Sequence, residues 1–284
     1  MEPILLYFEN IPSRDRSLLL AGGIAFFWLV ETTFPLFRFS YHKWRHALVN
    51  FFFTLTTIAI NFVLAFLLLQ TSDWTQENAW GLLPLLDGWP LWTKILLGLM
   101  GLDLIGAYFI HWLEHKVRIL WRFHLIHHTD VHVDTTTANR HHPGESVFRF
   151  ASTALAVWIM GAPVWLIMLY QALSVFLSQF NHANFRLPES WDRWLSWLIV
   201  TPNMHHVHHH YVLPHTDTNY GNIFSIWDRL FGTFANLRQE DIRYGIDTHL
   251  AEPEHTRIGT MLRIPFQAYR KPVGSKFEST QEGS

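Results

Sequence analysis

The chain of 284 residues is 49% hydrophobic and 16% aromatic, and only 15% of its residues are charged. In a typical soluble domain about a quarter of all residues are charged, so this lower fraction favours a membrane protein. The formal net charge of -2 gives no general attraction to nucleic acid. The lack of cysteine excludes disulfides, iron–sulfur clusters, thiolate-bound haem and cysteine nucleophiles. Any metal must therefore bind nitrogen and oxygen ligands, and the chain has 19 histidines.

Four apolar stretches follow one another along the chain. The first, 18–30, is short and could span a membrane only if extended, whereas 47–69 is uncharged and matches the ~20 residues of a spanning helix. The third is 95–113. The fourth, 150–180, is too long for one span and too short for two, and Pro163 interrupts it. We therefore expect an all-α integral membrane bundle, with about three spanning helices plus a broken helical hairpin.

Charged residues predict the orientation and the domains. Basic residues follow the first and third stretches, whereas the connection between the second and third is acidic, so the positive-inside rule places that connection outside the cytoplasm. The histidine-rich segments then form a cytoplasmic cap, in the bacterial inner membrane or the endoplasmic reticulum. We expect N-terminal membrane helices over 1–94, a histidine-rich domain over 95–235 and a polar C-terminal extension over 236–284. The tail at 271–284 has the composition of a disordered segment.

A soluble all-α protein with buried helices is the alternative to this membrane arrangement. It has difficulty accommodating the uncharged segment at 47–69.

Three groups of histidines lie between residues 111 and 215. In each group the spacing is i,i+4 or i,i+3, which places imidazoles on one face of a helix. The groups are His111 and His115; His124, His127 and His128; and His205, His206, His208, His209 and His210. The second group reads HxxHH, and the third contains this pattern in two registers, beginning at His205 or at His206.

One HxxxH and two HxxHH patterns offer eight imidazoles, more than one tetrahedral zinc ion uses. They suit two metal ions, each with several nitrogen ligands and an open position. Imidazole binds iron, zinc, copper and nickel, so the spacing does not name the metal. Outside these groups, we interpret His42 and His46 as an interfacial polar face, and His249 and His255 as surface residues.

Further patterns accompany the histidines. They are DLIGAYFIHWLEH at 103–115, FHLIHHTDVHVDTTTANRHHPGE at 123–145, and, within 201–234, TPNMHHVHHHYVLPHTDTNYG and IWDRLFGTF. Together they resemble the fatty acid hydroxylase superfamily, also called the sterol desaturase family, over most of residues 100–235. The resemblance selects the register that begins at His205 and adds His182 at the end of the hairpin. The implied metal ligands are His111, His115, His124, His127, His128, His182, His205, His208 and His209.

The resemblance also implies residues that orient these imidazoles through their second ring nitrogen. An Arg-x-His-Pro-x-Glu element matches Arg140 to Glu145, and its histidine is either a ligand or a neighbour of one. The implied residues are Asp103, His142, Glu145, Asp217 and Asn219. Many family members have arginine directly after the first histidine, where this chain has Trp112. This departure weakens assignment to a subfamily and removes no ligand.

The resemblance implies a membrane-bound di-iron oxidoreductase that uses dioxygen to hydroxylate or desaturate a lipid, such as a sterol or a fatty acyl chain. Zinc could substitute for iron in such a site. The sequence has no flavin or nicotinamide motif, so electrons must come from a partner such as cytochrome b5 or a ferredoxin.

Two other classes remain open. Glu114 lies within an HxxEH string, which would also suit the general base of a membrane zinc hydrolase. A histidine-rich metal-binding or transport protein would instead distribute its ligands along a path through the membrane.

Overall fold

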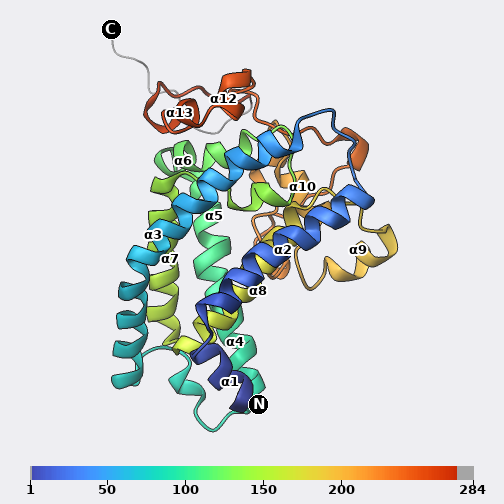
Figure 1. The fold of residues 1–284 in the computed structure, drawn as a ribbon. Helices are drawn as coiled ribbons and strands as arrows, with labels where there is room; N and C mark the ends of the chain where they lie inside the picture. Colours follow the sequence, from blue (N-terminus) through green and yellow to red (C-terminus); the bar gives the residue numbers. More distant parts are fainter. Residues whose placement is uncertain (1, 274–284) are drawn as a thin grey trace.

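The computed structural model describes residues 2–273, and in this range the fold is built from helices with two isolated β-bridges. Most of the tail for which we predicted disorder, 274–284, lies outside the described residues. Long helices form one end of the molecule, and short helices with loops form a cap at the other (Figure 1). The all-α membrane bundle expected from the sequence is therefore the architecture of the chain.

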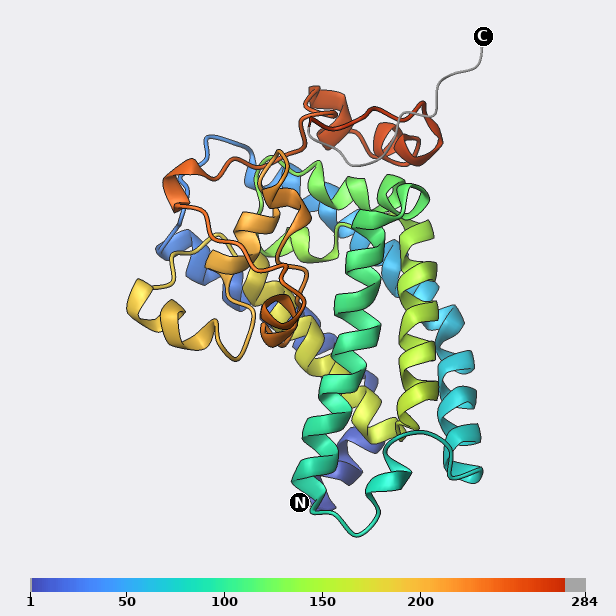
Figure 2. The same ribbon diagram turned by 180° about the vertical axis from the view of Figure 1, so that it is seen from behind.

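The membrane part contains the long helices and two short ones, α1 and α5. In chain order they are α1 (Glu2–Glu9), α2 (Ser13–Thr33), α3 (Lys43–Glu77), α4 (Leu91–Asp103), α5 (Ile110–Lys116), α7 (Pro143–Met160) and α8 (Val164–His182). A π-helical turn, η2 (Leu104–Phe109), joins α4 to α5, so these run as one continuous helix (Figure 2). The short helix η1 (Pro84–Leu86) lies in the connection before α4.

Three of the described helices are long and apolar enough to cross a membrane: Lys43–Glu77, Leu91–Lys116 and Val164–His182. The first two contain the stretches that we expected to span. The third is the second arm of the expected hairpin, which is long enough to cross by itself. Helix α2, which contains the 18–30 stretch, is not among the three. It packs instead along α8.

The hairpin is broken at Gly161–Pro163, as Pro163 predicted. Gly161 has a φ of 64°, and a Cβ there would lie 2.0 Å from the carbonyl oxygen of Trp80, so only glycine fits this turn. The end of α3 satisfies the carbonyl groups that the break exposes. Ser72 donates to the carbonyl of Ala162 at 2.8 Å, and Gln76 donates to that of Gly161 at 3.0 Å. Such internal partners are needed wherever a helix is interrupted away from water.

The apolar core lies between α4, α7 and α8, where Leu102, Val157 and Leu166 are fully buried. The cap covers the ends of these helices. Its elements are α6 (Arg118–His128), η3 (Thr135–Asn139), α9 (Glu189–Leu195), α10 (Pro202–His208), η4 (His215–Asp217), α11 (Ile226–Leu230), η5 (Gln239–Asp241), α12 (Glu252–Thr256), α13 (Ile258–Met261) and η6 (Ile264–Phe266).

Buried polar contacts fasten the cap to the membrane helices. His46 of α3 was expected on an interfacial polar face, but its Nε2 lies 2.8 Å from Asp130 and its Nδ1 lies 3.2 Å from Asp134. That expectation was wrong for His46, whereas His42 is exposed. Arg140 is fully buried and donates to the side chain of Asn50 at 3.0 Å. A buried arginine or histidine with such partners keeps its hydrogen bonds away from water.

The C-terminal extension packs against α6. Its contacts show that the expectation of surface positions for His249 and His255 was wrong. His249, expected on the surface, is buried, and its Nδ1 lies 2.8 Å from the hydroxyl oxygen of Thr248. His255 is half-buried, and its carbonyl oxygen accepts a hydrogen bond from Arg140. Sequence polarity alone could not show that this extension closes over the rest of the cap.

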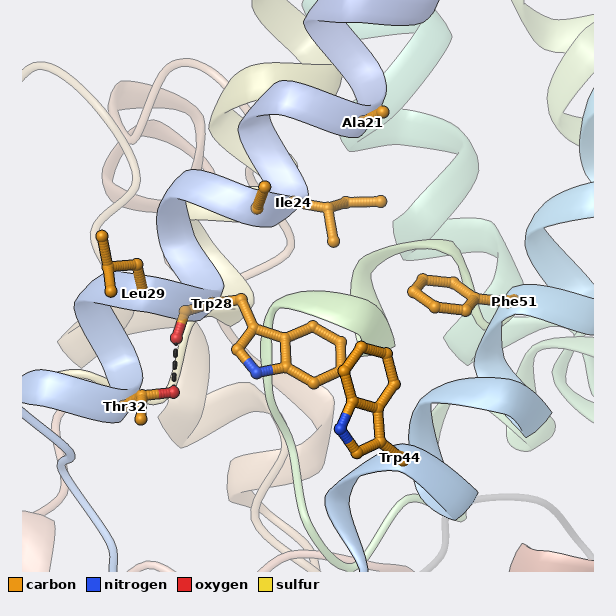
Figure 3. Close-up of a pocket in the computed structure, with 8 residues that line it drawn as sticks. Ala21, Ile24, Trp28, Leu29, Thr32, Trp44 and Phe51 are labelled. Carbon is orange, nitrogen blue, oxygen red and sulfur yellow. Dashed lines mark hydrogen bonds between the residues drawn. The ribbon is translucent and has the colours of Figure 1, made fainter.

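An apolar groove of about 490 Å³ opens between α2 and α3 on the outer surface (Figure 3). The rings of Trp28 and Trp44 lie 4.9 Å apart within it, and Phe51 lines it from further along α3. None of the expected metal ligands lines this groove. It is therefore separate from the histidine groups described next.

Candidate metal centre

The nine expected ligands converge into two groups inside the cap. Within each group, one ligand nitrogen of every member lies within 4.8 Å of the others, and every member is buried. The first group is His111, His115, His124, His128 and His208. The second group is His127, His182, His205 and His209. These two sets are called group 1 and group 2 below.

The HxxHH spacing explains how the members are divided. Residues four apart lie one above the other on a helix, so His124 and His128 of α6 join the same group. The residue at i+3, His127, turns toward the other group. The HxxHH motif that begins at His205 is divided the opposite way. Its i and i+4 members, His205 and His209, belong to group 2, and its i+3 member, His208, belongs to group 1. Each HxxHH cluster thus contributes to both groups.

Distances between ring nitrogens fit neighbouring ligands of one ion. The Nε2 atoms of His124 and His128 are 3.2 Å apart, and those of His127 and His182 are 3.1 Å apart. The Nε2 atoms of His182 and His205 are 3.0 Å apart. Two metal–nitrogen bonds of about 2.1 Å at a right angle place their nitrogens about 3.0 Å apart. The imidazoles therefore have the spacing that a shared ion requires.

Several imidazoles are held so that Nε2 is free to bind. The Nδ1 atoms of His111, His208 and His182 lie 2.8, 2.7 and 2.7 Å from the carbonyl oxygens of Tyr220, Thr218 and Ser178. A carbonyl accepts a proton from Nδ1, which leaves the Nε2 lone pair for a metal. This arrangement of hydrogen bonds is the usual one for metal-binding histidine.

Other ring nitrogens are buried with no hydrogen-bond partner. Among them are the Nε2 atoms of His111, His115, His208 and His209; the Nε2 of His206, which lies outside both groups, and the Nδ1 atoms of His127, His128, His205 and His209 are further examples. Leaving a buried polar atom unpaired costs about 1–3 kcal/mol, so the four Nε2 atoms within the two groups need an explanation. Metal ions would supply the missing partners. The residues present therefore fit two metal ions.

Burial keeps the cap imidazoles neutral, as a ligand must be. Desolvation lowers the pKa of His124 to about 4, although the neighbouring Glu145 acts in the opposite direction. The pKa values of His127, His205 and His209 are well below the usual value for the same reason. Neutral imidazole offers a lone pair, so the site is ready to bind metal at neutral pH.

Glu145 links the metal groups to a buried ionic network. Its Oε1 lies 2.8 Å from the Nδ1 of His124 and 2.8 Å from that of His141, and it accepts from Arg149 at 2.9 Å. Arg149 also donates to Glu114 at 2.6 Å. The resemblance implied Glu145 as a residue that orients the imidazoles, and the structure places it in contact with His124.

His141 is a residue of this site that the sequence analysis missed. Its ring stacks on that of His127 with centroids 4.7 Å apart, and it forms a third cluster with His124 and Glu145. The resemblance had directed attention to His142 instead. The i,i+4 spacing between His141 and Glu145 was the available signal.

The remaining expected site residues lie outside the two groups. His142 caps α7 by accepting from the backbone of Gly144 at 2.9 Å. Asp103 accepts from Trp227 and from two backbone amides, and therefore fastens the loop before α11 to α4. Asp217 pairs with Lys116 and accepts from Tyr220.

Asn219 and the two extra histidines also have structural contacts. Asn219, at a φ of 53°, bridges the backbones of Met204 and Ala235. The Nδ1 of His206 lies 2.7 Å from the hydroxyl oxygen of Tyr244, and the Nδ1 of His210 accepts from the amide of Arg243. Neither His206 nor His210 belongs to a metal group.

A cavity of about 460 Å³ lies within the cap next to group 1. His115 forms part of its wall, together with Trp121 and Phe234. The volume falls within the range of about 300–1,000 Å³ that is usual for small-molecule sites. A bound molecule in this cavity would lie next to the first metal group.

Comparison with known proteins places this centre in a family. Residues 95–233 match the model of the fatty acid hydroxylase family. An ornithine lipid hydroxylase, OlsE, of Rhizobium tropici is 33% identical over 150 residues, which cover 53% of this chain and 44% of that protein.

Two relatives from Danio rerio are also similar to this chain. Alkylglycerol monooxygenase of Danio rerio is 33% identical over 175 residues, covering 59% of this chain and 35% of that protein. A cholesterol 25-hydroxylase-like protein 1, member 2, of Danio rerio is 29% identical over 175 residues, covering 55% of this chain and 57% of that protein. The chain thus spans less than two thirds of each of these relatives. No solved structure matches it. Residues 95–233 therefore form a domain of the fatty acid hydroxylase superfamily.

Proposed function

We propose that the protein is a membrane-bound di-iron oxidoreductase that uses dioxygen and externally supplied electrons to hydroxylate a lipid, or to desaturate it. This proposal rests on the two buried histidine groups beside a cavity. Group 1 has five imidazoles and group 2 has four. The relatives are hydroxylases and monooxygenases by name, which supports an oxygenase over other metal enzymes.

The proposed ions would be held by group 1 and group 2. Bound iron would supply the activation of dioxygen that breaks an unactivated C–H bond, and zinc in its place would not. The chain's own residues fix the imidazoles through carbonyl oxygens and Glu145, and exclude bulk water by burial. Hydroxylation consumes one dioxygen, two electrons and two protons for each alcohol and water formed.

The substrate we propose is a membrane lipid. Ornithine lipid, alkylglycerol and cholesterol, which appear in the names of the relatives, are all amphiphiles. The cavity suits such a molecule because apolar side chains, such as Trp121 and Ile246, share its wall with the ion pair of Lys116 and Asp217. The reacting carbon would lie near His115. Electrons would come from a separate redox protein, of the cytochrome b5 or ferredoxin kind.

One contact counts against the zinc hydrolase alternative. Glu114 would be the general base of that enzyme, but it is fully buried and bound to Arg149. Transport of metal is disfavoured too, because all nine ligands gather at the cap end of the helices.

Comparative lipid mass spectrometry tests the proposal. A strain that carries the gene should contain a lipid that is heavier by one oxygen atom, or lighter by two hydrogens, than in a strain that lacks it. Complementation with the His205→Ala variant should not restore that lipid, whereas the His210→Ala variant should restore it, since His210 lies outside both groups. An unchanged lipid profile in all four strains would contradict the proposal.

A further inference from the structure

Helix α9 and the turn after it present apolar side chains outward. Trp191, Trp194 and Leu198 follow one another at i, i+3 and i+7, and they are 65%, 76% and 69% exposed. The inward side is polar, because Asp192 accepts a hydrogen bond from the hydroxyl of Thr201 at 2.5 Å. A helix on the surface of a soluble protein has the opposite arrangement. This face therefore needs an apolar partner.

The exposed apolar surface continues from α9 onto α11. We call the whole surface the tryptophan patch; its members are Trp191, Trp194, Trp197, Leu198, Ile226, Leu230 and Phe231. Phe231 stacks on Tyr108 with ring centroids 5.4 Å apart. Tyr108 belongs to the spanning helix Leu91–Lys116, where the adjacent Phe109 is exposed. The patch is thus continuous with the lipid-facing surface of a membrane helix.

The chemistry of the patch suits the boundary between lipid headgroups and acyl chains. Tryptophan prefers this boundary because its ring is apolar and its N–H is polar. Cations lie at the edge of the patch: the guanidinium of Arg229 is 4.5 Å from the ring centre of Trp197, and Arg186 and Arg193 are exposed. Arginine beside apolar surface can extend its charge toward phosphate groups.

The position of α9 in the fold is consistent with contact between this helix and the boundary of lipid headgroups and acyl chains. In both views it lies beside the cap-side end of α8, far from the connection that contains η1 (Figures 1 and 2). We propose that the tryptophan patch docks into the headgroup–acyl boundary of the leaflet next to the histidine groups. Its partner is the lipid surface itself, and α9 is an interfacial segment rather than a water-exposed part of the cap. This inference does not depend on the proposed reaction.

Docking at this place would hold the metal ligands at a fixed depth. Thr201, which α9 binds through Asp192, also caps α10 by accepting from the amide of Met204 at 3.3 Å. A β-bridge between Ile199 and Phe224 ties the same turn to the segment before α11. Helix α10 carries His205 and His208, so the patch connects the membrane surface to both metal groups.

The lack of cysteine permits a clean test with single-cysteine variants. Trp194→Cys would be labelled with an environment-sensitive fluorophore, and the full chain reconstituted in phosphatidylcholine vesicles that carry a nitroxide at a shallow or a deep acyl position. Phe62→Cys, in the middle of α3 and 82% exposed, is the control for the hydrocarbon interior. Glu240→Cys, at the exposed residue of η5, is the control for water.

We expect the label at position 194 to be quenched more by the shallow nitroxide, and that at position 62 more by the deep one. The label at 240 should respond to iodide in water and to neither lipid. Leu230→Cys, at the other side of the patch, should repeat the result for 194. If both patch positions behave like 240, the proposal is overturned. It is equally overturned if their shielding from iodide disappears on dilution of protein in the vesicles, because a second copy of the chain would then be the cover.

Discussion

The hydrogen-bond partner of each imidazole decides which ring nitrogen would face a bound metal. His111, His182 and His208 each hold a backbone carbonyl through Nδ1, whereas His124 holds the carboxylate of Glu145. A carboxylate makes its imidazole a stronger electron donor than a carbonyl does. Group 1 therefore contains one imidazole whose electron-donating strength depends on a buried ionic network, whereas no imidazole of group 2 has a carboxylate partner at Nδ1.

Adjacent histidines should have separable effects. His127 belongs to group 2 and His128 to group 1, although they are neighbours in the chain. We expect His127→Ala and His128→Ala each to lower the metal content by about one ion per chain, because each removes one ligand from a different group. Metal analysis of the purified proteins checks this. Full metal content in either variant would show that the assigned ligand is wrong.

His141 and His142 are adjacent in the chain, but their replacement by alanine should affect different properties: metal binding for His141 and stability for His142. His141 shares Glu145 with His124, so His141→Ala should weaken metal binding or activity by about 10- to 100-fold. His142 caps α7, and its Nε2 lies 3.4 Å from the carbonyl oxygen of Leu262, so neither ring nitrogen is in a histidine group. His142→Ala should therefore reduce the free energy of unfolding by about 1 kcal/mol and leave the metal in place. Metal titration and thermal unfolding measure the two effects. The opposite result would restore His142 as the residue beside the metal.

At the scale of elements, helix spacing predicted which histidines would act together. The i,i+4 pairs on α5 and α6 each stay within one group, and so does the pair formed by His205 of α10 and His209, which directly follows that helix. The sequence could not show that the i+3 member turns to the other group, because that depends on how α6 and α10 face each other. It also could not show that Asp103 fastens a loop, since its partners are 120 or more residues away.

The break between α7 and α8 has a backbone that only glycine adopts without strain. Gly161→Ala places a Cβ against Trp80 at a positive φ, so it should destabilise the fold by about 1–3 kcal/mol. Gly22→Ala is the control, because a Cβ at this helical position meets nothing within 4 Å. Thermal unfolding in detergent compares the two. Equal melting temperatures would show that the turn tolerates a side chain.

At the scale of the whole molecule, the histidine centre lies at the cap end of a helical bundle, away from the connection that contains η1 (Figure 2). Composition and hydropathy were sufficient to predict the bundle and the broken hairpin. They did not reveal that the C-terminal extension buries His249 and partners Arg140, because those contacts join segments that carry no apolar signal. Orientation in the membrane follows from charge alone and remains a prediction.

That orientation can be measured with impermeant thiol reagents. In cells, Asp87→Cys lies in the connection before α4 and should react from outside the cytoplasm. Glu252→Cys, at the exposed start of α12 in the cap, should react only after the membrane is opened. The reverse pattern would place the metal centre outside the cytoplasm and exclude a cytoplasmic electron donor.

The most direct test of the central claim is to supply the purified, iron-loaded protein with isotopically heavy dioxygen, a reductant with a redox partner, and membrane lipid, and to weigh the product. We predict a lipid alcohol that carries one heavy oxygen atom, absent when the His205→Ala variant is used. A product whose added oxygen comes from water, or iron-loaded protein that consumes no dioxygen with any lipid supplied, would contradict an oxygenase and return the centre to hydrolytic or metal-storage chemistry.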